Sequence, residues 1–299
     1  MFEGFTEEYH QADGARLFLR RGGNPNKPPL LCLHGYPQTS AMWHLMAPLL
    51  AEDWQLIIPD LRGYGRSEKV ADTADHAAYA KRAMGRDMFA LMSGLGHRRF
   101  SILSHDRGAR VAHRMGMDQP SRIKAMTILD IAPTREMYQQ TSMGFATAYW
   151  HWFFLIQAAP LPEHQIMADP DAFWRHKCSH QVRKQTGKEM PFTTEALTEY
   201  LTAFRDPAAV HAMCEDYRAA ASIDIMHDDA DGTRKLEMPI QVLWAENGAI
   251  ERYFDALALW GMRASDLRGQ SVPASHYMAE EIPEMLADLI QPFLQAHLA

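Results

Sequence analysis

The sequence has few cysteines, no basic tract and no long apolar run. Its three cysteines, Cys32, Cys178 and Cys214, lie far apart, are odd in number and form no C-x-x-C pair. This spacing suggests neither a disulfide framework nor a zinc site, so we expect a reducing compartment. Lysine and arginine are nowhere concentrated, and the formal net charge is -7. We therefore expect no nucleic-acid partner and no acidic-membrane surface.

A segment for export or membrane insertion is also missing from the sequence. Glu3, Glu7 and Glu8 occupy the region where a secretory signal needs a basic and then an apolar stretch. The most apolar segment, residues 150–161, contains His151 and Gln157 and is too short to cross a bilayer. These features predict a cytoplasmic protein without a membrane partner.

Short apolar runs alternate with amphipathic stretches along much of the chain. Hydrophobic residues make up 47% and charged residues 22% of the 299 positions, which is enough to bury a sizeable core. The alternation predicts an α/β fold in which helices cover a mostly parallel sheet. Strands are predicted at residues 30–34, 55–59, 100–104, 126–130, 240–244 and 267–272, and helices at residues 79–94 and 108–117.

The alternation stops shortly after Asp130. Residues 134–230 are rich in aromatic residues and histidine, and their apolar spacing is helical rather than strand-like. We predict a helical cap over residues 134–230. It would be inserted between two parts of one α/β core, residues 1–133 and 231–299.

Residues 104–108, Ser-His-Asp-Arg-Gly, lie where a predicted strand ends and a helix begins. Small residues on both sides of a central nucleophile are typical of a nucleophile elbow, a sharp turn between strand and helix. Asp106 takes the central position, which is serine in most such enzymes. A carboxylate suits attack on an sp3 carbon that carries a leaving group, with an ester intermediate. The alternative is that Asp106 only caps the helix.

Two further motifs follow predicted strands. His-Gly-Tyr-Pro at residues 34–37 is a turn of the kind that supplies a backbone N–H to an oxyanion hole. The N–H of Tyr36, together with that of Arg107, is the predicted pair of donors. Residues 60–67, Asp-Leu-Arg-Gly-Tyr-Gly-Arg-Ser, follow the next strand.

His276 lies after the last predicted strand, near the C-terminus. A nucleophile, then an acid, then a histidine is the chain order of the α/β hydrolases. The acid that orients His276 is either Asp130, at the end of its strand, or Glu246, after the following strand. The residues alone leave both open.

The chain resembles the haloacetate dehalogenases of the α/β-hydrolase family, and among them the fluoroacetate dehalogenases. The resemblance runs along the whole chain, through LHGYPQTSAMWH, PDLRGYGRS, SHDRGARVAHR, ILDIAPT, AYWHWFF and DPAAVHAMCEDYRA. It implies an α/β-hydrolase fold, with Asp106 as nucleophile, His276 as general base and Asp130 as its acid. Ser104 is a departure, because relatives often have glycine there, although both residues are small.

The resemblance also implies the binding residues. Arg107 and Arg110 would hold the substrate carboxylate, and the donors to the departing halide would be His151, Trp152 and Tyr217. The two arginines are three residues apart at a helix start, where guanidinium forks and the positive helix end suit a small anion. The alternatives are surface ion pairs for the arginines, core packing for His151 and Trp152, and a surface position for Tyr217.

The expected activity is hydrolysis of fluoroacetate or chloroacetate to glycolate and halide through an aspartyl ester. No metal and no organic cofactor is expected, and the resemblance implies a possible homodimer. One alternative is an epoxide hydrolase with the same aspartate and histidine, although such enzymes usually have an apolar residue after the nucleophile, where this chain has Arg107. The other is a binding protein that keeps the fold without catalysis.

Overall fold

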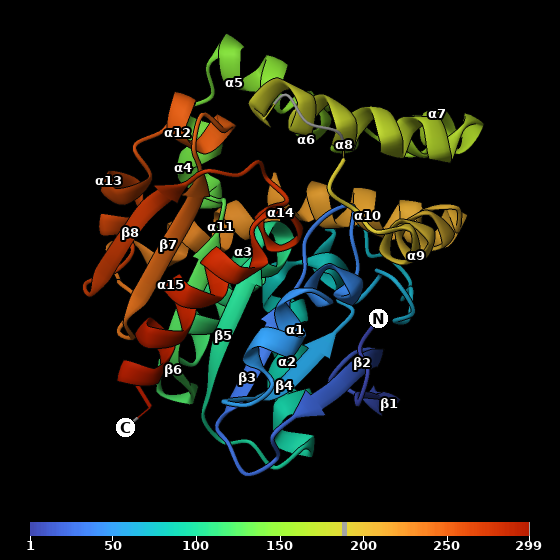
Figure 1. Ribbon diagram of the computed structural model, residues 1–299. Helices are drawn as coiled ribbons and strands as arrows, with labels where there is room; N and C mark the ends of the chain where they lie inside the picture. Colours follow the sequence, from blue (N-terminus) through green and yellow to red (C-terminus); the bar gives the residue numbers. More distant parts are fainter. Residues whose placement is uncertain (187–189, 299) are drawn as a thin grey trace.

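The computed structural model describes residues 1–186 and 190–298, the side chains of residues 179–186 excepted. The predicted cap includes residues 187–189, which lie outside the described residues. An eight-stranded sheet, in the order β1-β2-β4-β3-β5-β6-β7-β8, forms the centre of the molecule (Figure 1). Its strands are β1 Thr6–Gln11, β2 Arg16–Gly23, β3 Pro29–Leu33, β4 Gln55–Pro59, β5 Phe100–His105, β6 Ile123–Leu129, β7 Ile240–Ala245 and β8 Leu267–Val272.

The sheet is parallel from β4 to β8 in its spatial order, while β1 and β2 join antiparallel at one edge. The prediction of a mostly parallel sheet is confirmed, and each of the six predicted strands is present within a few residues of its predicted limits. Strands β1 and β2 were not predicted. The sequence of β1, TEEYHQ, is polar and largely exposed, so this edge strand has no apolar pattern to identify it.

Helices flank the sheet, with α1 and α15 over one face and α2 packed against α3 over the other (Figure 1). The predicted helix at residues 79–94 is α2, and the one at residues 108–117 is α3, which begins at Asp106. The helices and 3-10 turns outside the cap region are η1 Ser40–Trp43, α1 Met46–Leu50, η2 Ala77–Tyr79, α2 Lys81–Gly94, α3 Asp106–Asp118, η3 Pro120–Arg122, α12 Ala249–Tyr253, α13 Ala256–Gly261, α14 Met278–Glu281 and α15 Pro283–Ala296.

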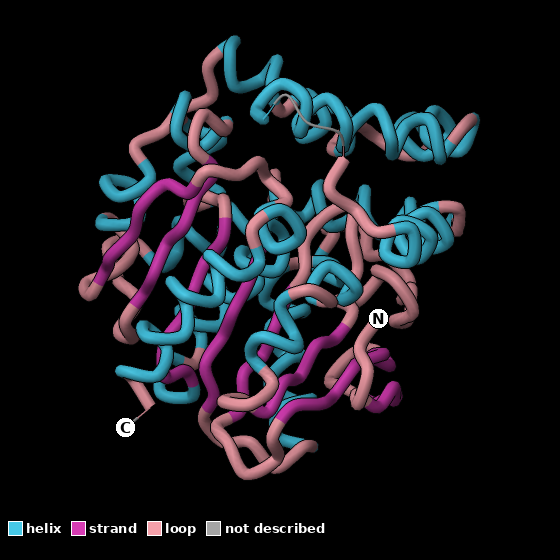
Figure 2. The backbone as a smooth tube through the Cα atoms, in the orientation of Figure 1, coloured by secondary structure: helices cyan, strands magenta, loops and turns pink. Residues whose placement is uncertain are grey.

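Between β6 and β7 the chain runs through a series of helices joined by loops (Figure 2). Several of them, α5 to α10, lie over the edge of the sheet at which the parallel strands end (Figure 1). Ligands of open α/β sheets bind at that edge. The helices of this segment are α4 Thr134–Gln139, α5 Met143–Ala148, α6 Trp150–Leu155, α7 Leu161–Ala168, α8 Pro170–Thr186, α9 Thr194–Phe204, α10 Pro207–Ala220 and α11 Ile223–Asp231.

Strand β5 and helix α3 form the most deeply buried strand–helix pair. Every residue of β5 is buried, and α3 is buried from Asp106 to Met117. Because β5 lies between β3 and β6, its carboxyl end opens near the middle of the sheet, beneath the helices of the β6–β7 connection. Among the described residues, no helix has the length and apolar character needed to cross a membrane.

The packing of α3 against β3 predicts that Gly108→Ala destabilises the fold. A Cβ at position 108 would lie 2.4 Å from the His34 carbonyl oxygen and 2.7 Å from the Leu33 carbonyl carbon, so backbone must move. We expect the free energy of unfolding to fall by about 1–3 kcal/mol, as measured by urea denaturation. The control is Gly94→Ala, also in a helix, where a Cβ meets nothing within 4 Å. A Gly108→Ala variant as stable as the control would contradict the prediction.

Candidate active site

Asp106 lies in a sharp turn between β5 and α3. Its φ of 44° is in the left-handed region, which is strained for a residue with a side chain. The Gly108 N–H donates to the His34 carbonyl at 2.9 Å, and a Cβ on Gly35 would lie 2.6 Å from the Asp106 Cβ. Close backbone approach therefore requires a small residue at Gly108 of the elbow and at Gly35 of the facing turn, and the turn has the geometry of a nucleophile elbow.

The Asp106 carboxylate is buried and stays ionised. The Tyr36 N–H donates to Oδ2 at 2.9 Å, which brings the predicted oxyanion turn to the predicted nucleophile. Burial would raise the pKa of Asp106, but electrostatic interactions with His276, His105, Arg110 and Arg107 together outweigh it and hold the pKa below its usual range. A carboxylate in this state is a ready nucleophile.

His276 is paired with Asp130. The imidazole Nδ1 lies 2.6 Å from Asp130 Oδ2, and Asp130 Oδ1 accepts the Ala245 N–H at 2.9 Å. The backbone of Asp130 turns sharply at the end of β6, with a φ of 52°. Glu246, the other residue that the sequence allowed, is exposed. The structure therefore places Asp130, and not Glu246, against His276.

His105 is a site residue that sequence reasoning missed. Its Nε2 lies 2.8 Å from the His276 carbonyl oxygen, and the two rings are 4.5 Å apart. Burial, with the charge of His276, lowers the pKa of His105 to about 3, so the ring is neutral and its Nε2–H donates to that carbonyl. The contact fixes the loop of His276 to the elbow. The sequence signal that could have identified His105 as a site residue is its position directly before Asp106 in the chain.

Arg107 is held by a residue of α10, in the helical connection between β6 and β7. Its Nε and Nη2 donate to Asp216 of α10 at 2.8 Å, and Asp216 also accepts from Tyr64 Oη at 2.6 Å and from Lys81. The guanidinium lies 4.1 Å from the centre of the Tyr217 ring. The side of the Arg107 guanidinium that was expected to hold a substrate carboxylate is thus occupied by Asp216. Of the three guanidinium nitrogens of Arg107, only Nη1 has no acceptor among the described residues.

Arg110 is buried on the same helix. Its Nη1 donates to Thr134 Oγ1 at 2.8 Å and to the Ala132 carbonyl at 3.2 Å, and the guanidinium lies 4.6 Å from the centre of the Trp152 ring. Nε has no partner among the described residues. Burial, together with the charge of Arg107, lowers the pKa of Arg110. A substrate carboxylate bound beside Arg107 and Arg110 would offset the electrostatic repulsion between the two guanidinium groups.

Aromatic residues of the cap close over Tyr36. The rings of Tyr217 and His151 are 5.2 Å and 6.1 Å from the Tyr36 ring, and Trp152 lies 6.5 Å from Tyr217. Burial, followed by the charge of Lys177, holds the pKa of His151 well below its usual range, so this imidazole is neutral. The structure therefore brings together the three residues that were expected to contact a halide.

Several buried donors around these residues have no acceptor within the described part of the chain. A buried donor without an acceptor costs roughly 1–3 kcal/mol, so a group of them marks a place where a ligand accepts hydrogen bonds. The unpartnered donor atoms are Tyr36 Oη, Arg107 Nη1, Arg110 Nε, Trp152 Nε1 and Tyr217 Oη.

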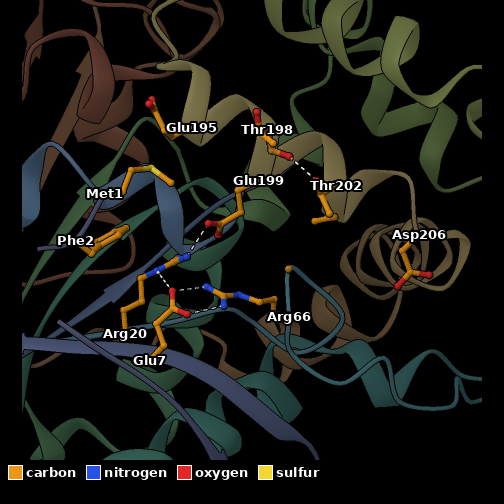
Figure 3. A pocket seen from close by; sticks show the side chains of 12 residues that line it. Met1, Phe2, Glu7, Arg20, Arg66, Glu195, Thr198, Glu199, Thr202 and Asp206 are labelled. Atoms are coloured by element: carbon orange, nitrogen blue, oxygen red, sulfur yellow. Dashed lines mark hydrogen bonds and ion pairs between the residues drawn. The ribbon is translucent and has the colours of Figure 1, made fainter.

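A cavity of about 570 Å³ lies elsewhere, between the N-terminal strands and α9 (Figure 3). Figure 3 shows Arg20 between Glu199 and Glu7, with Glu7 also bound to Arg66. Both arginines are thus neutralised, and none of the predicted site residues lines the cavity. It is not suited to a small anion.

Three residues of metal-ligand type, Asp72, His211 and Glu215, approach one another within 4.8 Å. Asp72 contacts His211 at 3.7 Å, and the other two have ionic partners outside the group. Glu215 contacts Arg218 at 2.8 Å, and His211 contacts Glu163 at 3.0 Å. The arrangement is that of an ion-pair network around a guanidinium, which a cation would have to displace.

Comparisons with known proteins agree with this geometry. A family model described as the α/β-hydrolase fold matches residues 28–281. The chain is 40% identical over 294 residues to fluoroacetate dehalogenase of Burkholderia sp, covering 98% of this chain and 95% of the relative. It is 28% identical to soluble epoxide hydrolase of Corynebacterium sp. (strain C12), covering 95% and 96%. A crystal structure of an α/β hydrolase from Nostoc sp PCC 7120 superimposes with a TM-score of 0.94 at 47% identity, covering 98% and 99%.

A parallel sheet with a strained elbow, a buried histidine and its aspartate is the framework of an α/β hydrolase. The chain belongs to that family, as the sequence predicted. Within the family it is an enzyme similar to fluoroacetate dehalogenase, and the resemblance stated from the sequence motifs is confirmed.

The ion pairs of Asp216 predict a stability that depends on pH. Asp216→Asn leaves Arg107 and Lys81 buried without their shared anion, so we expect the free energy of unfolding at pH 7 to fall by about 3–5 kcal/mol. Burial would raise the pKa of Asp216, but Arg107 and Lys81 hold it below its usual 3.8. Native stability from this group is therefore present above pH 3.8 and declines as the pH falls below that value.

Urea denaturation at pH 7 and pH 3 measures the free energy of unfolding of the native protein and of Asp216→Asn. We expect the difference between the two free energies to be smaller at pH 3 than at pH 7. Asp224→Asn is the control, because Asp224 contacts Lys81 at 3.3 Å but has no bond to Arg107. If the difference in the free energy of unfolding is the same at the two pH values, the charge of Asp216 is not the cause of the lost stability.

Proposed function

We propose that this protein hydrolyses haloacetates to glycolate and halide, with Asp106 as nucleophile. The observation that carries the proposal is the group of unpartnered donors around an ionised Asp106 that has His276 beside it. Two of these donors are guanidinium N–H groups, which suit a carboxylate. The others come from indole and phenol groups, which suit a departing halide. Similarity to fluoroacetate dehalogenase of Burkholderia sp supports the same chemistry.

In the first step, a carboxylate oxygen of Asp106 attacks the carbon that bears the halogen. The Tyr36 N–H holds Oδ2, so Oδ1 is the oxygen in a position to attack. As the new C–O bond forms, the carbon–halogen bond breaks and the halide leaves with the electron pair. Oδ2 then becomes the carbonyl oxygen of the ester, already in contact with an oxyanion donor.

In the second step, water attacks the ester carbonyl carbon of Asp106. His276, with Nδ1 held by Asp130, takes a proton from this water at Nε2. Negative charge develops on Oδ2, where the N–H groups of Tyr36 and Arg107 stabilise it. The intermediate collapses, and glycolate leaves as His276 returns the proton to its oxygen. Asp106 now carries one oxygen from water, and it is regenerated as the carboxylate when the second proton of that water is released to solvent.

The cap supplies the donors for the departing halide. Fluoride is strongly hydrated and leaves poorly, so it needs several donors at once. Trp152 Nε1 and Tyr217 Oη are buried without acceptors among the described residues, and the neutral His151 ring adds one N–H. For the substrate carboxylate, the available donors are Arg110 Nε and Arg107 Nη1.

Epoxide hydrolysis is the second candidate, because the unpartnered phenols of Tyr36 and Tyr217 are also suitable donors to an epoxide oxygen. A halide-release and diol assay with fluoroacetate, chloroacetate and styrene oxide separates the two. We expect halide from both haloacetates and no diol. Diol from styrene oxide with no halide from chloroacetate would overturn the proposal.

Removal of one halide donor should affect fluoride more than chloride. Trp152→Phe keeps a ring against Arg110 but removes the indole N–H. A hydrogen bond to a charged group contributes about 1.5–3 kcal/mol, so we expect kcat on fluoroacetate to fall about 10- to 100-fold. Chloroacetate, with a better leaving group, should lose less. Equal losses for the two substrates would mean that Trp152 serves only in packing.

Loss of the base should separate the two steps. In His276→Asn the carboxylate still attacks carbon, but water is not activated. We expect a burst of one halide per active site, after which turnover stops. Mass spectrometry should then find a carboxymethyl ester on the peptide that contains Asp106. No burst and no adduct, in a variant that binds substrate, would exclude Asp106 as the nucleophile.

A further inference from the structure

Lys177 of α8 is a buried lysine beside the site that none of the steps above uses. Only 3% of the residue is exposed. Its Nζ donates to the Tyr36 carbonyl at 3.4 Å and to the Tyr277 hydroxyl at 3.2 Å. The same atom lies 5.0 Å and 5.6 Å from the centres of those two rings. Lys177 therefore lies between Tyr36, whose N–H binds Asp106, and Tyr277, which follows His276 in the chain.

This ammonium has no carboxylate partner within ion-pair distance among the described residues. Buried lysines are ordinarily paired with an anion, and both hydrogen-bond acceptors of Lys177 are neutral oxygens. An ammonium carries three N–H donors, of which the described residues engage two. Burial lowers the pKa of Lys177, and Cys178 and the Asp106 carboxylate act against that shift. The ammonium, bound to Tyr36 and Tyr277, is thus within electrostatic range of Asp106, and an anion arriving there would favour its protonated form.

The charges of the site explain why such a cation is needed. The charge of Arg107 is already neutralised by Asp216. Asp106 stays ionised, and Arg110 and Lys177 are the cations near it without a carboxylate of their own in the described structure. A haloacetate would add a further negative charge. Without Lys177, Arg110 would face these charges alone in a site shielded from water.

We propose that Lys177 determines specificity, its ammonium providing from the cap the positive charge that balances a small monocarboxylate bound next to Asp106. The inference rests on the proposed function and names a residue that makes the site selective for anions. A lysine that only fastened the cap to the core would affect charged and neutral ligands alike.

The test compares binding of acetate with binding of acetamide, its neutral analogue, by NMR titration, which does not depend on turnover. Lys177→Met keeps the stem and removes the charge, while Lys177→Arg keeps a charge. We expect Lys177→Met to raise the Kd of acetate about 10-fold or more and to leave that of acetamide within about 2-fold. Lys177→Arg should recover most of the loss.

The matched control is Arg175→Met, which removes a cation from the exposed face of the same helix and should leave the Kd of acetate unchanged. Lys177→Gln replaces the methionine variant if that one does not fold. Equal weakening of acetate and acetamide, unchanged acetate binding, or no recovery with arginine would overturn the inference. Native protein that binds acetate through Lys177 but releases no halide from haloacetates would overturn the proposed function instead.

Discussion

The structure depends on one constraint, an ionised carboxylate buried at the carboxyl edge of a parallel sheet. Isolated in the interior, Asp106 would be neutral, because burial alone raises its pKa. The fold keeps it charged with a backbone N–H from Tyr36 and with nearby cations. The strained elbow, the glycines that permit close backbone approach and the His276–Asp130 pair are all arranged around that charge. A carboxylate held in this way stays unprotonated near neutral pH.

The core and the cap contribute different parts of the site. The α/β core carries Asp106, His276 and both arginines, and the helical connection between β6 and β7 carries the aromatic donors and Lys177. Asp216 of α10 connects the two, because it holds Arg107 of α3 by two bonds and accepts from Tyr64. The position of the cap therefore decides which N–H of Arg107 is available to a ligand. Under the proposed function, anion recognition therefore depends on this contact between α3 and α10.

Patterns that are local in the chain were predictable from the sequence. The apolar runs identify the parallel strands because buried strands need continuous hydrophobic residues, and the turn that contains Asp106 needs small residues at fixed offsets. Chain order and motif resemblance then pointed to His276 and to the aromatic residues of the cap. The polar edge strand β1 was not predicted, because its sequence has no apolar face.

The sequence by itself determined the fold class, the position of the elbow and the set of residues able to take part in the chemistry. Only the tertiary structure decided how those residues are paired. It placed Asp130 against His276 and left Glu246 exposed. It also paired the guanidinium of Arg107 with Asp216, which lies 109 residues away along the chain. It also left Lys177 without a carboxylate among the described residues. The physical reason is that hydrogen bonds and ion pairs act over a few ångströms in space, whatever the separation along the chain.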